Sequence, residues 1–515
     1  MRKATYWIVL FICTSSFSQV TIDESAYGYF NYALQFSSND LFGSSRMLGI
    51  GGAQNALGAD IGTQALNPAG LGVYRKSDWG LSLGTDQLSA QSQLQTTVEN
   101  TTTRSSDGNI NVPVIGFVFA SKEDDPDVNS WKNQAFGMSV TRLNSFDQSF
   151  NYKGRNRNFS FRNFLVEAAN GTNYQEFANQ FDQGLVQNVF GGAYYGYILN
   201  AIDESGNETQ QSTYFTIDGD KDDVVEEQVN QSGRTNQWNF GYGANYEDKL
   251  YIGGNLGVLS LRREINSTYT ESLVVENDLT SFSYITDEVT RGIGLNFSVG
   301  IITRPTNNVR LGFTYKSPTA VSLTEEFEAR TVSNFNNFLI PGTNVVLNEL
   351  QFRTPRSSFS YQLKMPAKYT LGGAYFIQKK AFISADVDFI PYHRMSLTSD
   401  FDPFTGDNAT INAIYKTGIN FRIGGEYRYD IYRARIGFAR IGNPYRKEFE
   451  TTNIAQNNIT AGAGIRLKDY YFDLAAVYST QNRAYRSYSF NDGGEPFVDT
   501  RFSSTRLVFT GGIFF

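Results

Sequence analysis

Arginines cluster on two neighbouring segments of the chain in a pattern suited to binding a carboxylate. Arg422 lies on one alternating segment, and Arg433 and Arg435 lie on the next. Alternate residues of a strand face the same side, so all three should point away from the aromatic side chains of these segments. A guanidinium makes paired hydrogen bonds to a carboxylate, which makes the three candidates for contact with an acidic head group. The alternative is a structural network of ion pairs with acidic residues such as Asp386 and Asp473.

Residues that often carry catalysis or bind metals form no recognisable site in this sequence. His393 is the only histidine, and Ser396 is close to it, but no nucleophile motif surrounds the pair. The acidic run at 218–223 lacks the turn glycine of a calcium loop, and Val229 stands where a closing glutamate belongs. A solvated loop is the better interpretation, with loosely held calcium as the alternative. We therefore expect no enzyme activity, no cofactor and no metal site.

The N-terminus predicts an exported protein. Arg2 and Lys3 precede an apolar stretch, and a small-x-small cleavage site follows at 16–18, so residues 1–18 should form a signal peptide. The only cysteine, Cys13, lies inside it. The net charge of −7 argues against nucleic acid as a partner, because such binding needs a basic surface. No later stretch reaches the roughly 18 consecutive apolar residues that a membrane helix requires.

Apolar and polar residues alternate over many short segments. Clear examples are 238–246, 293–301, 309–315, 470–478 and the C-terminal 507–515. A strand with such a period of two has one apolar face and one polar face. The apolar face is aromatic at its ends and aliphatic in its middle, which is typical of strands that face lipid. The pattern predicts a transmembrane antiparallel β-barrel, with the parity of Phe515 as the lipid face.

Short and long connections alternate along the barrel region, which we place at 78–515. Short polar links such as 247–249 and 468–469 separate long polar stretches, of which 144–234 is the longest. Short periplasmic turns and long extracellular loops are the arrangement of outer-membrane barrels. Pairing each long loop with two strands predicts about fourteen strands, with both termini on the periplasmic side. Within the longest loop, Phe177, Phe181 and Leu185 follow amphipathic helix spacing.

Residues 19–77 do not follow the strand pattern. They are rich in glycine, alanine and asparagine and contain short pieces that can form helix. A barrel of fourteen strands encloses a lumen wider than its own side chains fill, so a segment of this length suits a plug. The alternative is a disordered periplasmic extension, which the regular hydrophobic residues of the segment argue against.

One part of this segment resembles a known family. The run Arg46-Met47-x-Gly49-x-Gly51-Gly52-Ala53 and the triplet Asn67-Pro68-Ala69 resemble the hatch of outer-membrane long-chain fatty-acid transporters of the FadL/TodX type. The resemblance, with signal peptide, hatch, strands and terminal Phe515, covers essentially the whole chain. The terminal aromatic residue also resembles the signal read by the barrel-assembly machinery.

The resemblance implies a monomeric barrel that takes up hydrophobic small molecules such as long-chain fatty acids. Uptake would be passive and gated by the hatch, with exit into the membrane lipids through a gap in the wall. The family also implies that Phe177, Phe181 and Leu185 form a hydrophobic landing groove at the extracellular mouth. The alternative for these three is that they pack the loop onto the barrel rim.

A second function is compatible with the same resemblance. Related barrels in type IX protein secretion have a similar hatch and act as docking shuttles for exported proteins. Lipid that copurifies with the barrel would favour small-molecule uptake, whereas a stoichiometric secreted protein would favour the shuttle.

Overall fold

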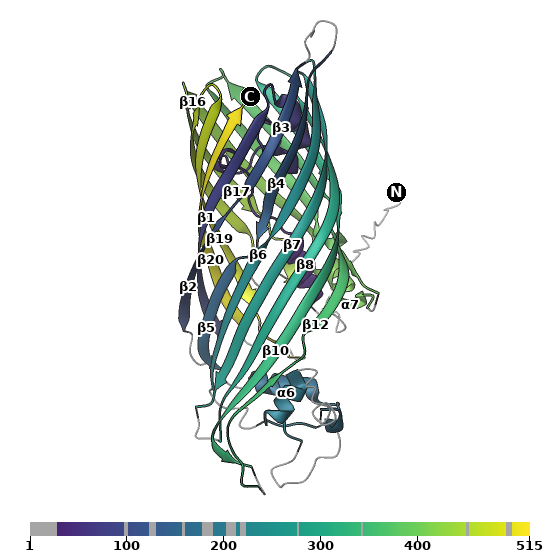
Figure 1. The fold of residues 1–515 in the computed structure, drawn as a ribbon, viewed down its shortest axis with the longest axis vertical. Helices are drawn as coiled ribbons and strands as arrows, with labels where there is room; N and C mark the ends of the chain where they lie inside the picture. The colour runs from purple at the N-terminus through teal and green to yellow at the C-terminus, as the bar shows by residue number, and fades with distance from the viewer. Residues whose placement is uncertain are drawn as a thin grey trace, which may run out of the picture.

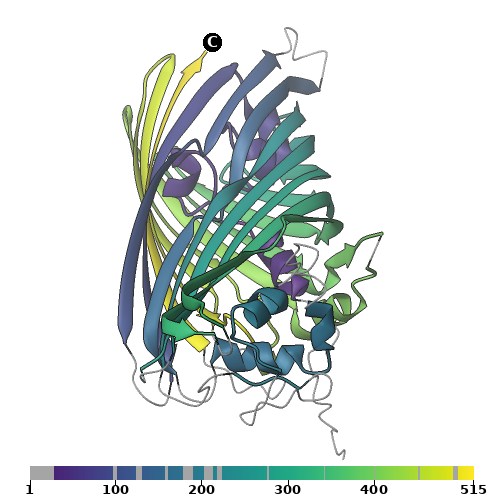
Figure 2. The same cartoon turned by 60° about the horizontal axis from the view of Figure 1, so that its bottom comes forward.

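The protein forms a tall barrel closed around an N-terminal segment (Figures 1 and 2). The structure is a computed structural model that describes residues 28–96, 101–122, 130–156, 160–177, 189–201, 213–216, 223–274, 278–340, 343–400, 402–449, 453–490 and 497–515. The predicted signal peptide lies outside these residues. So do Phe181 and Leu185, two of the three residues of the predicted landing groove. No helix within them is long and apolar enough to cross a membrane.

The barrel wall is antiparallel, and it closes where β1 pairs with β20 along its full length. The strand segments are β1 (Asp78–Gln95), β2 (Thr102–Asn111), β3 (Val114–Lys122), β4 (Trp131–Ser145), β5 (Gln148–Asn156), β6 (Asp223–Tyr246), β7 (Leu250–Ser272), β8 (Leu279–Thr303), β9 (Val309–Lys316), β10 (Thr319–Leu339), β11 (Val346–Arg353), β12 (Ser357–Met365), β13 (Lys368–Ile377), β14 (Ala381–Pro391), β15 (Ser396–Thr398), β16 (Thr417–Tyr429), β17 (Tyr432–Ile441), β18 (Gln456–Arg466), β19 (Tyr470–Tyr485) and β20 (Phe497–Phe514).

These twenty segments make fourteen strands in the described part of the chain, as the sequence predicts. Six of them continue the segment before them after a short break, namely β3, β5, β10, β12, β13 and β15. β1 begins at Asp78, the residue at which the barrel is expected to begin. The fold class predicted from alternation is therefore confirmed.

The apolar parity of the strands faces outward. Phe297 is 52% exposed and its strand neighbour Asn296 is 4% exposed, and the same contrast recurs around the wall. In β20, Leu507 and Phe509 are exposed, as is Phe515 directly after the strand, whereas Val508 is buried. Exposed apolar side chains in a continuous band mark the surface that lipid covers. The parity of Phe515 is thus the lipid face.

The strands run further into the predicted loops than alternation indicates. The stretch 144–234 was expected to be one loop, but β5 occupies part of its start and β6 begins at Asp223. Likewise β7 continues to Ser272, and β8 begins at Leu279, well before the alternating segment at 293–301. These strand ends are polar on both faces because they extend beyond the lipid band, so a search for apolar alternation misses them. The longest loop is shorter than predicted at both ends.

Short helices lie inside the barrel and at one end of it. The N-terminal segment contributes α1 (Tyr29–Ser37), α2 (Ser45–Gly49), α3 (Thr63–Leu66) and the 3-10 helix η1 (Pro68–Val73). The connections at the end opposite the short turns contribute α4 (Phe161–Ala169), α6 (Val189–Tyr195), η2 (Tyr392–Arg394), α7 (Thr405–Ile414) and η3 (Lys447–Phe449). We call these two ends the short-turn end and the long-loop end. Figure 1 shows α6 at the long-loop end, away from the C-terminus.

The described part of the N-terminal segment, residues 28–77, lies within the lumen and is called the hatch below. Its residues bond to strands far apart in the wall: the backbone N–H of Ser45 donates to Thr510 Oγ1 at 2.8 Å, and that of Gly51 donates to Thr460 Oγ1 at 3.0 Å. Almost all of its residues between 41 and 74 are buried. The segment therefore fills the lumen, as predicted for a plug.

Glycines in the wall allow the hatch backbone to touch the barrel. A Cβ atom on Gly253, Gly312, Gly424 or Gly437 would overlap the backbone of Pro68, Asn55, Ile50 or Gly51 respectively. Gly51 itself has a φ of 64°, which glycine adopts without the cost that other residues meet. Close backbone approach at several strands means that hatch and wall fit each other as rigid surfaces.

Replacing Gly437 with alanine is expected to loosen the hatch without unfolding the barrel. The added methyl group overlaps the hatch at Gly51, and overpacking of this kind costs about 1–3 kcal/mol, or roughly a 5- to 150-fold larger population of the undocked hatch. A cysteine in place of the buried Ala53 reports this population through its rate of maleimide labelling. Gly373→Ala is the matched control, because a Cβ there has only Leu311 within 4 Å, at 3.8 Å. Equal labelling rates in the two variants would contradict a close-fitting hatch.

Candidate functional site: a lumen cavity between hatch and mouth

The lumen holds a cavity of about 1450 Å³ between the hatch and the long-loop end. Its floor is α1 with residues 38–41, and its walls come from β1, β5 to β8 and β18 to β20. Aromatic side chains gather near the mouth, among them Phe161, Tyr269 and Tyr284. Polar side chains cover much of the rest. A cavity of this volume holds a ligand of drug size or larger.

Arg263 holds α1 at the floor of the cavity. Its Nη1 donates to Gln35 Oε1 at 2.6 Å, and its guanidinium lies over the rings of Tyr32 at 4.1 Å and Phe36 at 4.9 Å. Glu288 pairs with the same guanidinium and also accepts a hydrogen bond from the Tyr32 hydroxyl at 2.9 Å. One face of α1 is thus attached to β7 and β8 through side chains.

Below α1, the Asn67-Pro68-Ala69 triplet ties the centre of the hatch together. Asn67 caps η1 by accepting from the backbone N–H of Ala69 at 3.1 Å, and its Nδ2 donates to the carbonyl of Asn55 at 2.7 Å. Asn55 in turn receives a hydrogen bond from Thr314 Oγ1 at 2.7 Å and donates its backbone N–H to Asp386 at 3.0 Å. The triplet is therefore connected to the wall through Asn55, which bonds directly to Thr314 and Asp386. Its role in gating stays a prediction.

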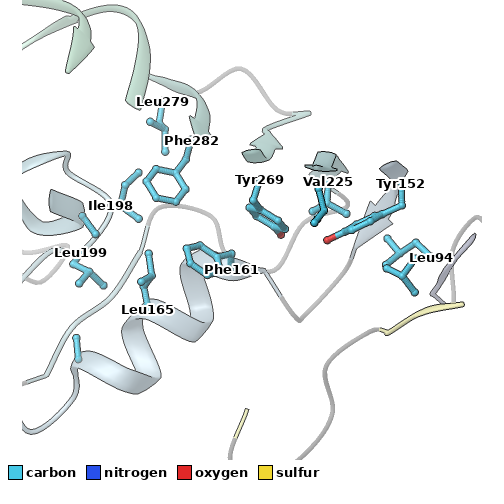
Figure 3. Packing of buried hydrophobic residues seen from close by; sticks show 14 of the residues in the cluster. Leu94, Tyr152, Phe161, Leu165, Ile198, Leu199, Val225, Tyr269, Leu279 and Phe282 are labelled. Atoms are coloured by element: carbon cyan, nitrogen blue, oxygen red, sulfur yellow. The ribbon is translucent and has the colours of Figure 1, made fainter. Parts of the chain in front are cut away.

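An aromatic cluster packs at the long-loop end, above the cavity. Figure 3 shows Phe161 and Leu165 of α4 packed near Phe282, with Tyr269 and Tyr152 further along. The buried Arg162 anchors this helix, since its Nε donates to Glu271 at 3.0 Å and it also pairs with Asp223. Helix α4 is thus fixed to β6 and β7.

Four hydroxyl groups converge on the Glu227 carboxylate at the mouth. Tyr152 and Tyr485 donate to it at 2.8 and 2.9 Å, and Ser267 and Ser487 also donate. These donors come from β5, β7, β19 and the segment after β19. Glu227 therefore links β5 and β7 to β19 at the lining of the cavity.

The wall has a seam beside the cavity, between β2 and β5. In the described residues β2 pairs with β1, and β5 pairs with β6, but no backbone ladder joins β2 to β5. The seam begins where both strands break, at 112–113 and at 146–147. Pro113 has no N–H to donate to a ladder, which accounts for the first break.

Side chains hold the seam closed. Across the seam, Asn109 Nδ2 donates to Asp147 Oδ2 at 2.5 Å. Arg142 of β4, on the same side of the seam as Asp147, pairs with this carboxylate at 2.9 Å. Further along, Ser105 Oγ donates to the carbonyl of Ser149 at 2.8 Å. These side-chain hydrogen bonds can break while the backbone pairing of each strand stays intact. A backbone ladder between β2 and β5 would hold the two strands together more firmly.

The hatch covers the inner side of the seam. The backbone N–H of Asp40 donates to the carbonyl of Leu143 at 3.2 Å, and its carboxylate accepts from the backbone N–H of Ser145 at 3.0 Å. A small pocket of about 20 Å³ remains between residues 40–43 and the two strand breaks. Loss of water around Asp40 raises the pKa of its carboxyl group, an effect that the nearby Arg506 opposes.

The predicted arginine Arg422 lies in an ion-pair network at the level of the hatch. Its Nη1 and Nη2 donate to the two oxygens of Asp388 at 2.8 and 2.7 Å, and Asp386 lies 3.8 Å from Nη2. Lys368 also pairs with Asp388, at 3.0 Å. This is the structural alternative that the sequence left open.

The other two predicted arginines lie below the cavity as well. Arg435 is fully buried and pairs with Glu426 at 2.7 Å and with Asp473 at 2.6 Å. Arg433 donates to the carbonyl of Asp430 at a short turn, at 2.6 Å. Among the described residues that line the cavity, none of the three predicted arginines is present. Their contact with a head group stays a prediction.

The predicted landing residue Phe177 is buried at the long-loop end. It is 2% exposed and packs against the rings of Tyr214 at 5.8 Å and Tyr194 at 6.0 Å. This packing is the alternative reading, in which the stripe attaches the loop to the rim. The landing groove stays a prediction.

His393 and Ser396 are on separate elements. His393 is in η2, and Ser396 begins β15, where it lies opposite Lys364 of β12. Within the described ranges, no group of three or more histidine, cysteine, aspartate or glutamate side chains is placed to hold a metal ion.

Sequence reasoning missed the seam and the cavity's own arginines. Two signals for the seam are present in the sequence: Pro113 inside an alternating stretch, and the interruption at 146–147. No sequence signal distinguishes Arg263, Arg483 and Arg506, which line the cavity, from other arginines in the strands. Only closure of the barrel brings them to one space.

Comparison with solved structures identifies the fold. The chain is similar to the P. putida toluene transporter TodX, with a TM-score of 0.51 and 15% identity over 92% of this chain and 99% of that chain. It is also similar to a Pseudomonas aeruginosa FadL homologue, with a TM-score of 0.54 and 13% identity over 93% and 99% of the two chains. No protein-family model and no curated protein sequence matches the chain. The chain therefore has the fold of the FadL- and TodX-type barrels, in which the sequence resemblance had placed it.

Proposed function

We propose that this protein is an outer-membrane channel for the passive uptake of hydrophobic small molecules. One observation carries the proposal: the hatch blocks the straight path through the lumen, while the wall beside the cavity above it has a seam that only side chains hold closed. A blocked lumen does not suit a water-filled pore, whereas a side exit suits compounds that dissolve in lipid. The solved structures of the same fold, described as a toluene transporter and a FadL homologue, support the same class of cargo.

The proposed path has three steps. A compound enters at the long-loop end, which faces the outside, and occupies the cavity. The hatch segment 38–43 then moves away from the seam, where it is held by three hydrogen bonds to β4. The compound leaves sideways between β2 and β5, next to the exposed side chains of Ile110 and Val112. The residues of this path need no bound cofactor to perform these steps.

Uptake by whole cells tests the proposal. Cells that export the barrel are compared with cells that carry an empty vector, with radiolabelled dodecanoate and toluene as probes. Faster uptake of at least one probe supports the proposal. Equal uptake, together with an assembled barrel on heat-dependent gel electrophoresis, contradicts it.

A further inference from the structure

The cavity has a polar wall that a channel for plain hydrocarbons does not need. Inward positions of β18, β19 and β20 carry hydrogen-bonding side chains that line the cavity: Asn458, Ser479, Gln481, Arg483, Thr500 and Ser504. Some of these bond to one another or to the backbone, as Ser479 does to Asn458 at 2.6 Å. A hydrocarbon placed against this wall would displace water and supply no hydrogen bonds. Each of these groups would then lose the hydrogen bonds that water supplied, which weakens the binding of a plain hydrocarbon.

Arg483 differs from the other two arginines described above as lining the cavity. Arg263 pairs with Glu288, and Arg506 pairs with Asp86 at 2.6 Å. Arg483 instead donates to two glutamine side chains, from Nη1 to Gln148 at 2.9 Å and from Nε to Gln481 at 3.2 Å.

The Nη2 of Arg483 is therefore available to a ligand. In the described part of the chain this nitrogen makes no hydrogen bond, and no carboxylate lies within 4 Å of the guanidinium. Asp40 of the hatch acts on Arg483 through space only, because its carboxylate bonds to the backbone of Ser145. A guanidinium held by two amides keeps its full charge for an anionic ligand.

An apolar surface adjoins this guanidinium. Tyr485, the next inward residue of β19, packs edge-on against Phe150 at 5.0 Å, and Phe150 contacts Phe502 at 6.0 Å. Gln148, which holds Arg483, is the first residue of β5 after the strand break at the seam. Charged, polar and apolar surfaces thus meet next to the proposed exit.

We propose that the cavity selects amphipathic acids whose head carries further hydrogen-bonding groups beside the carboxylate, such as N-acyl amino acids, and that Arg483 binds the carboxylate. The inference rests on the proposed function and narrows its cargo. The amide or hydroxyl groups of the head replace water on the polar wall, and the apolar tail lies against Phe150 and Phe502. Plain hydrocarbons and plain fatty acids satisfy only part of this surface.

Isothermal titration of the full-length barrel in amphipol tests the inference with three probes: N-dodecanoylserine, its methyl ester and dodecanoate. We expect N-dodecanoylserine to bind about tenfold more tightly than dodecanoate, since its head adds one or two hydrogen bonds. Arg483→Gln should weaken both acids by roughly 10- to 100-fold and leave the methyl ester unchanged. The affinity of Arg483→Lys for the acids should lie between those of the unmodified chain and Arg483→Gln, because lysine keeps the positive charge. The matched control is Arg501→Gln, because Arg501 lies exposed on the outer face of β20.

The outcomes separate this inference from the function on which it rests. Equal affinity for N-dodecanoylserine and dodecanoate overturns the head-group class. Unchanged binding of the acids in Arg483→Gln overturns the role of Arg483. Either result leaves the uptake of hydrophobic compounds standing, whereas no binding of any probe contradicts the proposed function itself.

Discussion

Deletion of residues 40–70 is expected to turn a closed barrel into an open pore. The deletion removes α2, α3 and the Asn67-Pro68-Ala69 triplet, which together fill the lumen below the cavity. The wall of fourteen strands is too wide for its own side chains to close, and its inward glycines add no side chain at all. In planar lipid bilayers we expect conductance to rise at least about tenfold over the intact chain.

The wall itself should survive this deletion. Its longest strands are joined by continuous ladders: β6 pairs with β7, and β7 with β8, over more than twenty residues each. Heat-dependent gel mobility checks that the deleted chain is still an assembled barrel. An assembled barrel with unchanged conductance would show that the hatch does not close the lumen.

A cross-link over the seam is expected to abolish most uptake while leaving the barrel intact. Asn109→Cys and Asp147→Cys replace two side chains that meet across the seam, and a short bis-methanethiosulfonate reagent then joins the two thiols through disulfides. If compounds leave between β2 and β5, the cross-link removes the exit and uptake should fall about tenfold or more, because no other break of this kind adjoins the cavity in the described wall. Cleavage of the cross-link by a reducing agent should restore uptake.

A matched pair on a continuous ladder controls for the chemistry. Asn266 and Asp287 face each other in register across β7 and β8, and Asn266 donates to Asp287 in the same manner. Asn266→Cys with Asp287→Cys, cross-linked by the same reagent, should keep its uptake. Equal loss in both pairs, or no loss at the seam, would refute lateral exit at this place.

The elements of the wall were predictable because they obey a local rule. Alternation of Phe297 with Asn296 is dictated by one lipid face and one inner face, and each strand repeats it independently of its neighbours. The fourteen strands, the lipid parity and the lumen-filling hatch all follow from this rule and from the small residues before Asp78. The strand ends beyond the lipid band could not be predicted from this rule, because both faces of β5 and of the start of β6 are polar or mixed.

The site was decided by the tertiary structure, because inward parity alone does not say what a side chain meets. Arg435 and Arg483 both point inward from neighbouring parts of the wall, yet one is fully buried between two carboxylates and the other lines the cavity. What separates them is their height along the lumen relative to the hatch, which depends on contacts such as Gly51 against Gly437, 386 residues apart in number. The sequence by itself determined that this chain is a lipid-facing barrel with a segment in its lumen. Only the closed structure placed the cavity, the seam and the arginine that faces them, because these arise from residues brought together across the barrel.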